Sequence, residues 1–237
     1  MFPKPSHVCA ALDVRFFSTL SKADLKARNV SSISDYITLY KGNIVEFSEQ
    51  EKKILESHIK HIDRVCRKYT KFVSIPWLLV KLKCCLNENG YPHTIGRFIM
   101  LPSNFTSIHT DHEQKETILH EKVHIFQRVF PVETNVLLTH YWQYAINGIK
   151  SNMPRVRANP DTNNILYRRG SVSECYQRYN SDTPRDLADS VRYCVKGVHL
   201  YEHPYEQMAY IIADLLCHSQ IKNEDYIQVV RWMSTYF

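Results

Sequence analysis

The chain has 237 residues, a hydrophobic fraction of 44%, a charged fraction of 23% and a formal net charge of +6. These values are typical of a globular protein with one sizeable core. The mild positive charge is compatible with nucleic acid as a partner but does not require it. No apolar run approaches the roughly 18 residues of a membrane-spanning helix, so no membrane role is expected.

The N-terminus and the cysteines together predict a location. The first 17 residues contain no apolar segment followed by a small-residue cleavage site, so no secretory signal is expected. The seven cysteines are an odd number and include no CxxC pair. We therefore expect an intracellular, cytoplasmic protein in a reducing environment, whose cysteines are mostly packing residues.

The chain contains no repeat, no low-complexity segment and no Ser/Gly/Pro-rich linker. This predicts a single domain over residues 1–237, with a helical N-terminal part (1–90) and a second part (91–237) that carries the chemistry. The expected fold class is α+β and mainly helical.

The first clear element in chain order is a helix that begins after Ser48. Ser48 and Glu51 form a capping box, and apolar residues then recur at helical spacing as far as Tyr69. The opposite face is basic and offers a surface for nucleic acid, although a solvated face is the plainer interpretation; it carries Lys60, Arg64, Arg67, Lys68 and Lys71. Pro76 then suits the first turn of a second helix over 76–89, which Gly90 would end.

The remaining elements are read from short patterns. A short apolar run predicts a buried strand over 94–102. Thr110 or Asp111 can cap the next helix, which Pro131 stops, and a further helix is expected over 132–148. Residues 150–200 are predicted to be mostly irregular, with a strand at 164–169. Two helices follow, over 204–219 and from about 223 to 236.

The helix that precedes Pro131 contains the segment ETILHEKVHIFQR. Residues four apart on a helix lie one turn apart on one face, so His120 and His124 can both ligate one tetrahedral zinc ion. Glu121 is rotated by about 100° from His120, and it could act as a general base on a water activated by the zinc. The helix is apolar around these groups, and three buried ionisable side chains are costly unless something satisfies them.

The HEKVH segment resembles the active-site helix of zincin metallopeptidases, and Gln127 extends it to the HExxHxxQ variant. The resemblance implies a zincin-like fold with a small mixed sheet. It also implies that an edge strand, here residues 94–101, pairs with extended peptide substrate. The wider pattern is also similar to uncharacterised zincin-like proteins of large DNA viruses, which implies a virion-associated role.

The third zinc ligand is expected from the gluzincin pattern, because a metzincin would have Gly at position 127 and His at 130. Glu206 matches a glutamate ligand at the start of a second helix, with Ala209 leaving room for close packing. The rivals that remain open are Glu133, Glu202, His140 and Glu174. Asp214 could orient a ligating histidine, and its alternative role is a surface charge.

Zincins often use a Tyr, His or Arg beside the metal to stabilise the developing oxyanion. The main candidates for this role or for substrate contact are Tyr167, Tyr210 and Arg168, with Tyr201, Tyr205 and Arg169 behind them. The segment 157–169 mixes turn residues with a basic end and could line a cleft.

Three hypotheses follow. The first is a zinc peptidase in which His120, His124 and Glu206 hold Zn²⁺ and Glu121 is the base. The second is a non-catalytic assembly protein that keeps the zincin fold. The third is a nucleic-acid-associated protein that uses its basic helix. An intact Glu121 favours the first hypothesis, because a structural zinc site needs no general base.

Overall fold

A computed structural model describes residues 1–83, 87–150, 153, 155–170, 175–194 and 201–237. Its α+β class and its mainly helical content are as predicted. The helices are α1 (Pro5–Ala11), α2 (Lys22–Ala27), α3 (Ile33–Gly42), α4 (Glu49–Cys66), α5 (Thr70–Ser74), α6 (Phe105–Ile108), α7 (Asp111–Val129), α8 (Pro131–Val136), α9 (Pro204–His218) and α10 (Glu224–Tyr236). The strands are β1 (Ile44–Val45), β2 (Leu79–Leu82), β3 (His93–Ile95), β4 (Phe98–Pro102), β5 (Tyr144–Ile149), β6 (Ile165–Arg169), β7 (Cys175–Tyr179) and β8 (Ser190–Cys194).

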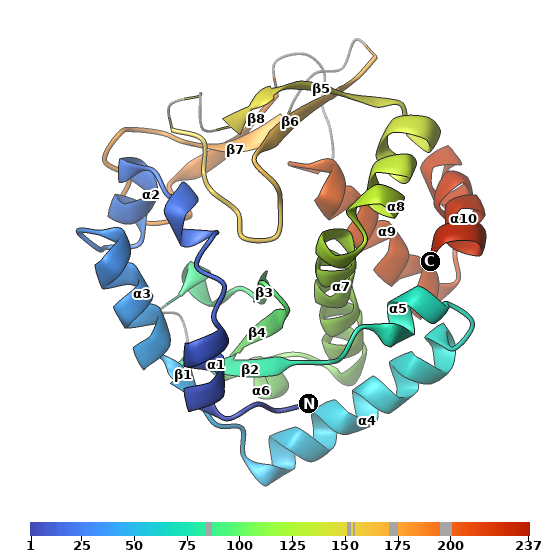
Figure 1. Ribbon diagram of the computed structural model, residues 1–237, viewed down its shortest axis with the longest axis horizontal. Coiled ribbons are helices and arrows are strands. Elements are labelled where there is room, and N and C mark those ends of the chain that lie inside the picture. Colours follow the sequence, from blue (N-terminus) through green and yellow to red (C-terminus); the bar gives the residue numbers. More distant parts are fainter. Residues whose placement is uncertain (84–86, 151–152, 154, 171–174, 195–200) are drawn as a thin grey trace.

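A small mixed sheet has the strand order β1-β2-β4-β3. The β2–β4 pair is parallel, whereas β1–β2 and β3–β4 are antiparallel. Two separate hairpins, β5–β6 and β7–β8, lie together at the opposite end of the molecule (Figure 1). The loop that precedes β6 descends from these hairpins toward β3 and α7.

The mixed sheet separates two apolar cores. Successive side chains of a strand point to opposite faces, and in β4 Ile99 and Leu101 join one core while Phe98 and Met100 join the other. The larger core contains side chains of α4, α7, α9 and α10, and the smaller core is covered by α1 and α3. The helices that carry the predicted metal ligands are therefore fixed against one face of the sheet.

The helix α7 is specified at its start and along one face. Thr110, one of the two caps expected from the sequence, caps it, and Glu113 completes a capping box. Ile118, Val123 and Phe126 are fully buried in the larger core. Their packing holds the helix in one rotation about its axis, and this rotation decides where the polar residues between them point.

Three predicted elements differ from the sequence interpretation. Residues 76–89 contain β2 rather than a helix, because a short apolar run fits a buried strand as well as a helix and β2 pairs with β4. The strand over 94–102 is the hairpin β3–β4, which turns at Gly96 with a φ of +60°. The helix over 132–148 ends in a π-helical turn, η3 (Leu137–Tyr141), and the chain then enters β5.

The segment 150–200 contains more strand than predicted. The strand β6 lies where one was expected, whereas β7 and β8 were missed. Cys175 and Cys194 join these two strands in a disulfide, so the expectation of reduced packing cysteines is wrong for this pair. Cys66 is free and buried, as expected, and Cys9 and Cys217 are free and partly exposed.

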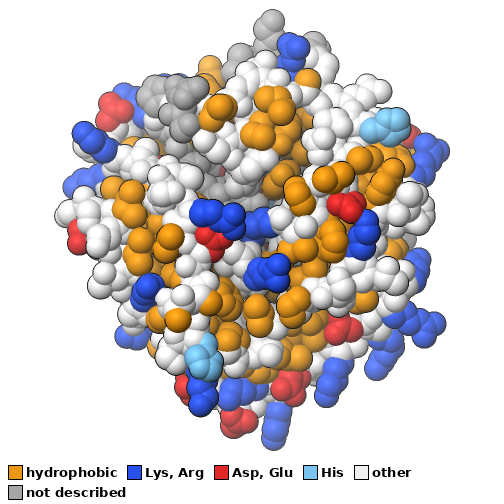
Figure 2. Space-filling model, in the orientation of Figure 1, with side chains coloured by type: hydrophobic (Ala, Val, Ile, Leu, Met, Phe, Trp, Pro, Cys, Tyr) orange, Lys and Arg blue, Asp and Glu red, His pale blue; other side chains and the backbone are white. Residues whose placement is uncertain are grey.

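Basic side chains gather along one edge of the face shown in Figure 2. Lys and Arg side chains follow α4 along the lower edge of the molecule (Figure 2), which is the basic face expected from the sequence. Among the described residues, no helix is long and apolar enough to cross a membrane.

Candidate metal centre

The helix α7 places two imidazoles side by side. His120 and His124 are one turn apart, and their Nε2 atoms lie 3.0 Å from each other. His124 is almost completely buried, and His120 is partly open to a cavity. The two nitrogens therefore converge on one point, as the i, i+4 spacing predicted.

The helix α9 brings a carboxylate to the same point. Glu206 lies in its first turn, and its Oε2 is 3.4 Å from Nε2 of His120 and 3.6 Å from Nε2 of His124. Zinc–ligand bonds of 2.0–2.1 Å in a tetrahedron place neighbouring ligand atoms about 3.3 Å apart. The three separations lie close to this value, so the donor set and its spacing fit a zinc ion.

Two side chains hold the donors in orientation. Gln127 donates from Nε2 to the Tyr205 carbonyl, which leaves its Oε1 to accept from Nδ1 of His124 at 2.9 Å. This bond fixes the imidazole with Nε2 facing the site. Asn159 donates to Oε1 of Glu206 at 3.0 Å, so Oε2 of that carboxylate is the oxygen turned toward the histidines.

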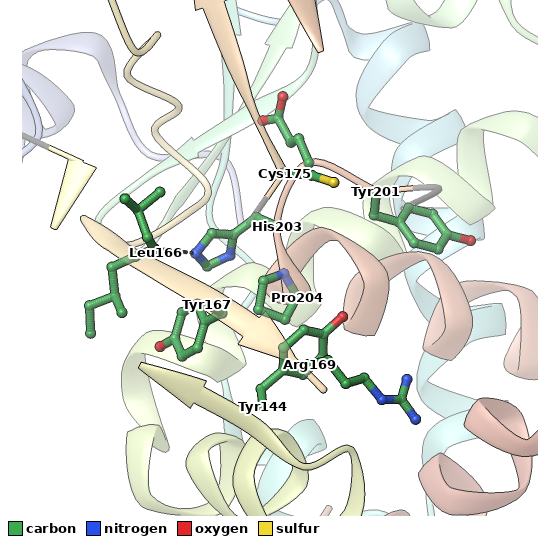
Figure 3. A pocket seen from close by; sticks show the side chains of 10 residues that line it. Tyr144, Leu166, Tyr167, Arg169, Cys175, Tyr201, His203 and Pro204 are labelled. Atoms are coloured by element: carbon green, nitrogen blue, oxygen red, sulfur yellow. Dashed lines mark hydrogen bonds between the residues drawn. The ribbon is translucent and has the colours of Figure 1, made fainter. Parts of the chain in front are cut away.

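The start of α9 is fixed by a buried histidine. His203 caps the helix by accepting from the Tyr205 amide, and its Nε2 lies 3.2 Å from the Ile165 carbonyl on β6. Figure 3 shows His203 between Tyr167 and Pro204, beside a cavity of about 20 Å³. Burial, together with the positive charge of Lys150, holds the pKa of His203 well below its usual value. A neutral His203 thus sets the position of Glu206 three residues later.

The loop before β6 is fastened to α7. Arg128 donates to the Pro160 carbonyl, the Gly96 carbonyl and the Thr94 hydroxyl. Asp161 accepts from the Thr94 amide at 2.8 Å and lies 3.6 Å from the Arg128 guanidinium. These contacts close one wall of the site and place Asn159 over Glu206.

Burial and neighbouring charges have opposite effects on the pKa values of Glu206 and His124. Burial raises the pKa of Glu206, but His124 and His120 outweigh that effect, so its pKa lies well below the usual value. Burial lowers the pKa of His124, but the charges of Glu206 and Asp161 raise it to about 9. Without metal, the pair is therefore an imidazolium beside a carboxylate.

Glu121 is the buried carboxyl next to this pair. Only 4% of its surface is exposed, and its Oε2 has no hydrogen-bond partner among the described residues. Burial, with the negative charges of Asp161 and Glu206, raises its pKa well above the usual value. A buried carboxyl whose pKa is raised above its usual value is a candidate for proton transfer in a catalytic site.

These groups share a large cavity of about 1060 Å³. His120, Glu121 and Glu206 line it together with residues from the loop before β6 and from α9. The expectation that segment 157–169 lines a cleft is confirmed for Arg157, Asn159, Pro160 and Asp161. The cavity is large enough to admit several residues of a peptide.

The structure brings together some of the predicted substrate-contact residues. Tyr210 lines the cavity, with its ring centroid 4.4 Å from that of His120. Tyr167 is buried away from this cavity and accepts from Asn163, because β6 turns it toward His203. Arg168 is exposed on the other face of the same strand. Neither residue contacts the metal ligands.

The rivals for the third ligand lie elsewhere or have other partners. Glu133 pairs with Lys71, His140 is exposed, and Glu202 accepts from Asn159. Glu174 lies outside the described residues. Asp214 accepts from Tyr226 and pairs with Lys222, and it is Gln127 rather than Asp214 that binds Nδ1 of His124.

The predicted substrate-binding edge is wrong for residues 98–101, which form β4, whereas residues 94 and 95 lie in β3, the edge strand of the sheet. The strand β4 is paired on both sides, by β2 and by β3, so its edges are not open to a peptide. The strand β3 is the edge strand next to α7, but the Thr94 amide already donates to Asp161. The sequence did not indicate this, because the hairpin at Gly96 was not foreseen.

Tyr201, Arg157 and Asn159 line the cavity as candidates from the sequence, but sequence reasoning missed the hydrogen bond that Asn159 donates to Glu206. Tyr201 stacks on Tyr210, and Arg157 lies 3.9 Å from Glu202. The only available signal was the run of turn residues around Pro160, which indicated a loop without indicating what it contacts.

Comparison with known proteins does not assign the chain to a family. No protein-family model, no curated protein and no solved structure matches the chain at a significant level.

Proposed function

We propose that the chain is a zinc-dependent peptidase with a zincin-like fold. The observation that carries the proposal is the convergence of His120, His124 and Glu206 on one point beside the unpaired carboxyl of Glu121. A purely structural zinc site has no need for a second, unligated and buried carboxyl.

The proposed metal ligands are the two Nε2 atoms and Oε2 of Glu206. Three protein ligands leave one tetrahedral position for water or substrate, which is the arrangement of catalytic rather than structural zinc sites. When bound there, zinc would polarise a peptide carbonyl and lower the pKa of a water molecule to about 7.

The residues of the chain would then move the protons. Glu121 takes a proton from the attacking water, whose oxygen bonds to the carbonyl carbon. As the C–N bond breaks, Glu121 returns that proton to the leaving amide nitrogen. Partial burial and the charges of Glu206 and Glu121 raise the pKa of Tyr210 to about 12. Tyr210 therefore keeps its proton and can donate a hydrogen bond to the developing oxyanion.

The test combines metal analysis with a peptide-library assay. Wild type, Glu121→Gln, His120→Ala and the exposed control Glu46→Gln are freed of loosely held metal and compared. We expect Glu121→Gln to keep its zinc and to lose activity by about a hundredfold or more, the general-base scale. His120→Ala should lose both zinc and activity, and Glu46→Gln should lose neither.

Two outcomes would overturn the proposal. Full metal content in His120→Ala would remove the metal site. Zinc in the wild type without cleavage of any library peptide would favour a non-catalytic protein that keeps the centre for assembly.

A further inference from the structure

The helices α7 and α9 face each other along a continuous line of ionisable residues. On α7 the line is His112, Glu116, His120 and His124, each one turn after the last. On α9 it is Glu206, Tyr210, Asp214 and His218, with the same spacing. His124 meets Glu206 at one end and His112 meets His218 at the other, so the helices run in opposite directions.

The far end of this line repeats the donor set of the first site. The Nε2 atoms of His112 and His218 lie 3.1 Å apart, and Oε2 of Glu116 lies 3.8 Å from the same atom of His218. The ligand atoms of these three side chains all lie within 4.8 Å of one another. Two imidazoles and one carboxylate at this spacing again approach the tetrahedral separation of about 3.3 Å.

The neighbours of His218 indicate which side chains are free to act as ligands at this end of the helices. Asp214 also approaches His218, with its Oδ1 4.0 Å from Nε2, but it already binds Lys222 and Tyr226. The side chains of Glu116 and His218 are 36% and 37% exposed, so the far end is open to solvent, unlike the buried first site. The protein ligands are therefore the two histidines and Glu116, and water can complete the coordination.

We propose that His112, Glu116 and His218 form a second site for zinc or a similar divalent transition metal, distinct from the first. His112 and His120 are eight residues apart, which is about 12 Å along a helix, whereas two metals that share a substrate lie about 4 Å apart. The second ion therefore takes no part in the reaction. It clamps the first turn of α7 to the last turn of α9 and so restrains the two helices that carry the first site.

The experiment is a zinc titration monitored by metal content and by thermal unfolding. Wild type is compared with His112→Ala/His218→Ala, with His120→Ala/His124→Ala, and with the exposed control His140→Ala. We expect two zinc equivalents in the wild type and in His140→Ala, the second bound more weakly, and one equivalent in each double variant. Excess zinc should raise the melting temperature of the wild type beyond the first equivalent, and this second rise should be absent in His112→Ala/His218→Ala.

The outcomes separate this inference from the proposed function. A single equivalent in the wild type, unchanged in His112→Ala/His218→Ala, would show that these histidines only hydrogen-bond to each other and would overturn the second site. Loss of one equivalent on removing His112 and His218, with no loss on removing His120 and His124, would support the second site while the first one fails.

Discussion

Replacement of Lys122 by methionine should stabilise the protein at neutral pH. Lys122 follows Glu121 on α7, but it points into the larger core and is only 1% exposed. Its Nζ has no hydrogen-bond partner among the described residues. It forms only a long ion pair with Asp63, whose Oδ1 is 3.9 Å from Nζ. The ammonium lies 4.0 Å from the ring centroid of Trp77, so a cation–π contact partly replaces the lost water.

The magnitude follows from two opposing effects. Burial lowers the pKa of Lys122 from 10.5 to about 8, and at 1.36 kcal/mol per pKa unit this is a cost of about 3 kcal/mol to the folded state. The contact with Trp77 returns about 2 kcal/mol at most. Methionine fills a similar volume without the charge, so Lys122→Met should raise the free energy of unfolding by about 1 kcal/mol at pH 7.

The pH dependence of unfolding provides a second test of the stability gain expected for Lys122→Met. Because the pKa is lowered in the folded state, the unfolded chain binds more protons between pH 8 and 10.5, and wild-type stability gains from Lys122 as pH rises through this range. The advantage of Lys122→Met should therefore shrink from pH 8 to pH 10.5. Urea unfolding at several pH values measures this, with the exposed Lys60→Met as control. A variant less stable than wild type at pH 7 would refute the reasoning, since the contact with Trp77 would then outweigh burial.

Three further predictions concern the candidate centre. Gln127→Leu should weaken zinc binding by 10–100-fold, because the orientation of His124 is lost; an unchanged affinity in a chelator competition would contradict this. Zinc affinity should fall about tenfold per pH unit below 9, because the raised pKa of His124 means that a proton must leave before metal binds; a flat profile between pH 7 and 9 would exclude it. Arg128→Met should lower the free energy of unfolding by about 3 kcal/mol, because it leaves the buried carboxylate of Asp161 without its cationic partner; a loss below 1 kcal/mol in urea unfolding would show that the loop before β6 does not depend on Arg128.

The local signals in the sequence were reliable where one segment determines its own structure. The capping box at Ser48 located the start of α4, and the two candidate caps Thr110 and Asp111 located that of α7 to within one residue. The spacing of His120 and His124 set their common direction. The resemblance to gluzincins placed Glu206 beside them, and Ala209, three residues later, was expected to let its apolar helix pack closely on α7. The role of all three as zinc ligands stays a prediction.

The signals failed where distant segments decide the outcome. Residues 76–89 form a strand because β4 pairs with β2, and nothing in the apolar run itself distinguishes a strand from a helix. Asn159 reaches Glu206 only because Arg128 and Thr94 hold its loop in place, and these three contacts join segments far apart in the chain. The partner of Cys175 was likewise hidden, since the pairing of β7 with β8 determines it.

The convergence of α7 and α9 has a consequence for the order of events during synthesis. Gln127 and Tyr205, which hold the centre together, are 78 residues apart in the chain. A nascent chain that ends before α9 carries only two of the three proposed ligands, His120 and His124, and a pair of imidazoles retains zinc weakly. Under the proposed function, metal capture is therefore coupled to completion of the C-terminal helices, and a truncated product is expected neither to acquire the ion nor to cleave a neighbouring polypeptide before its own fold is finished.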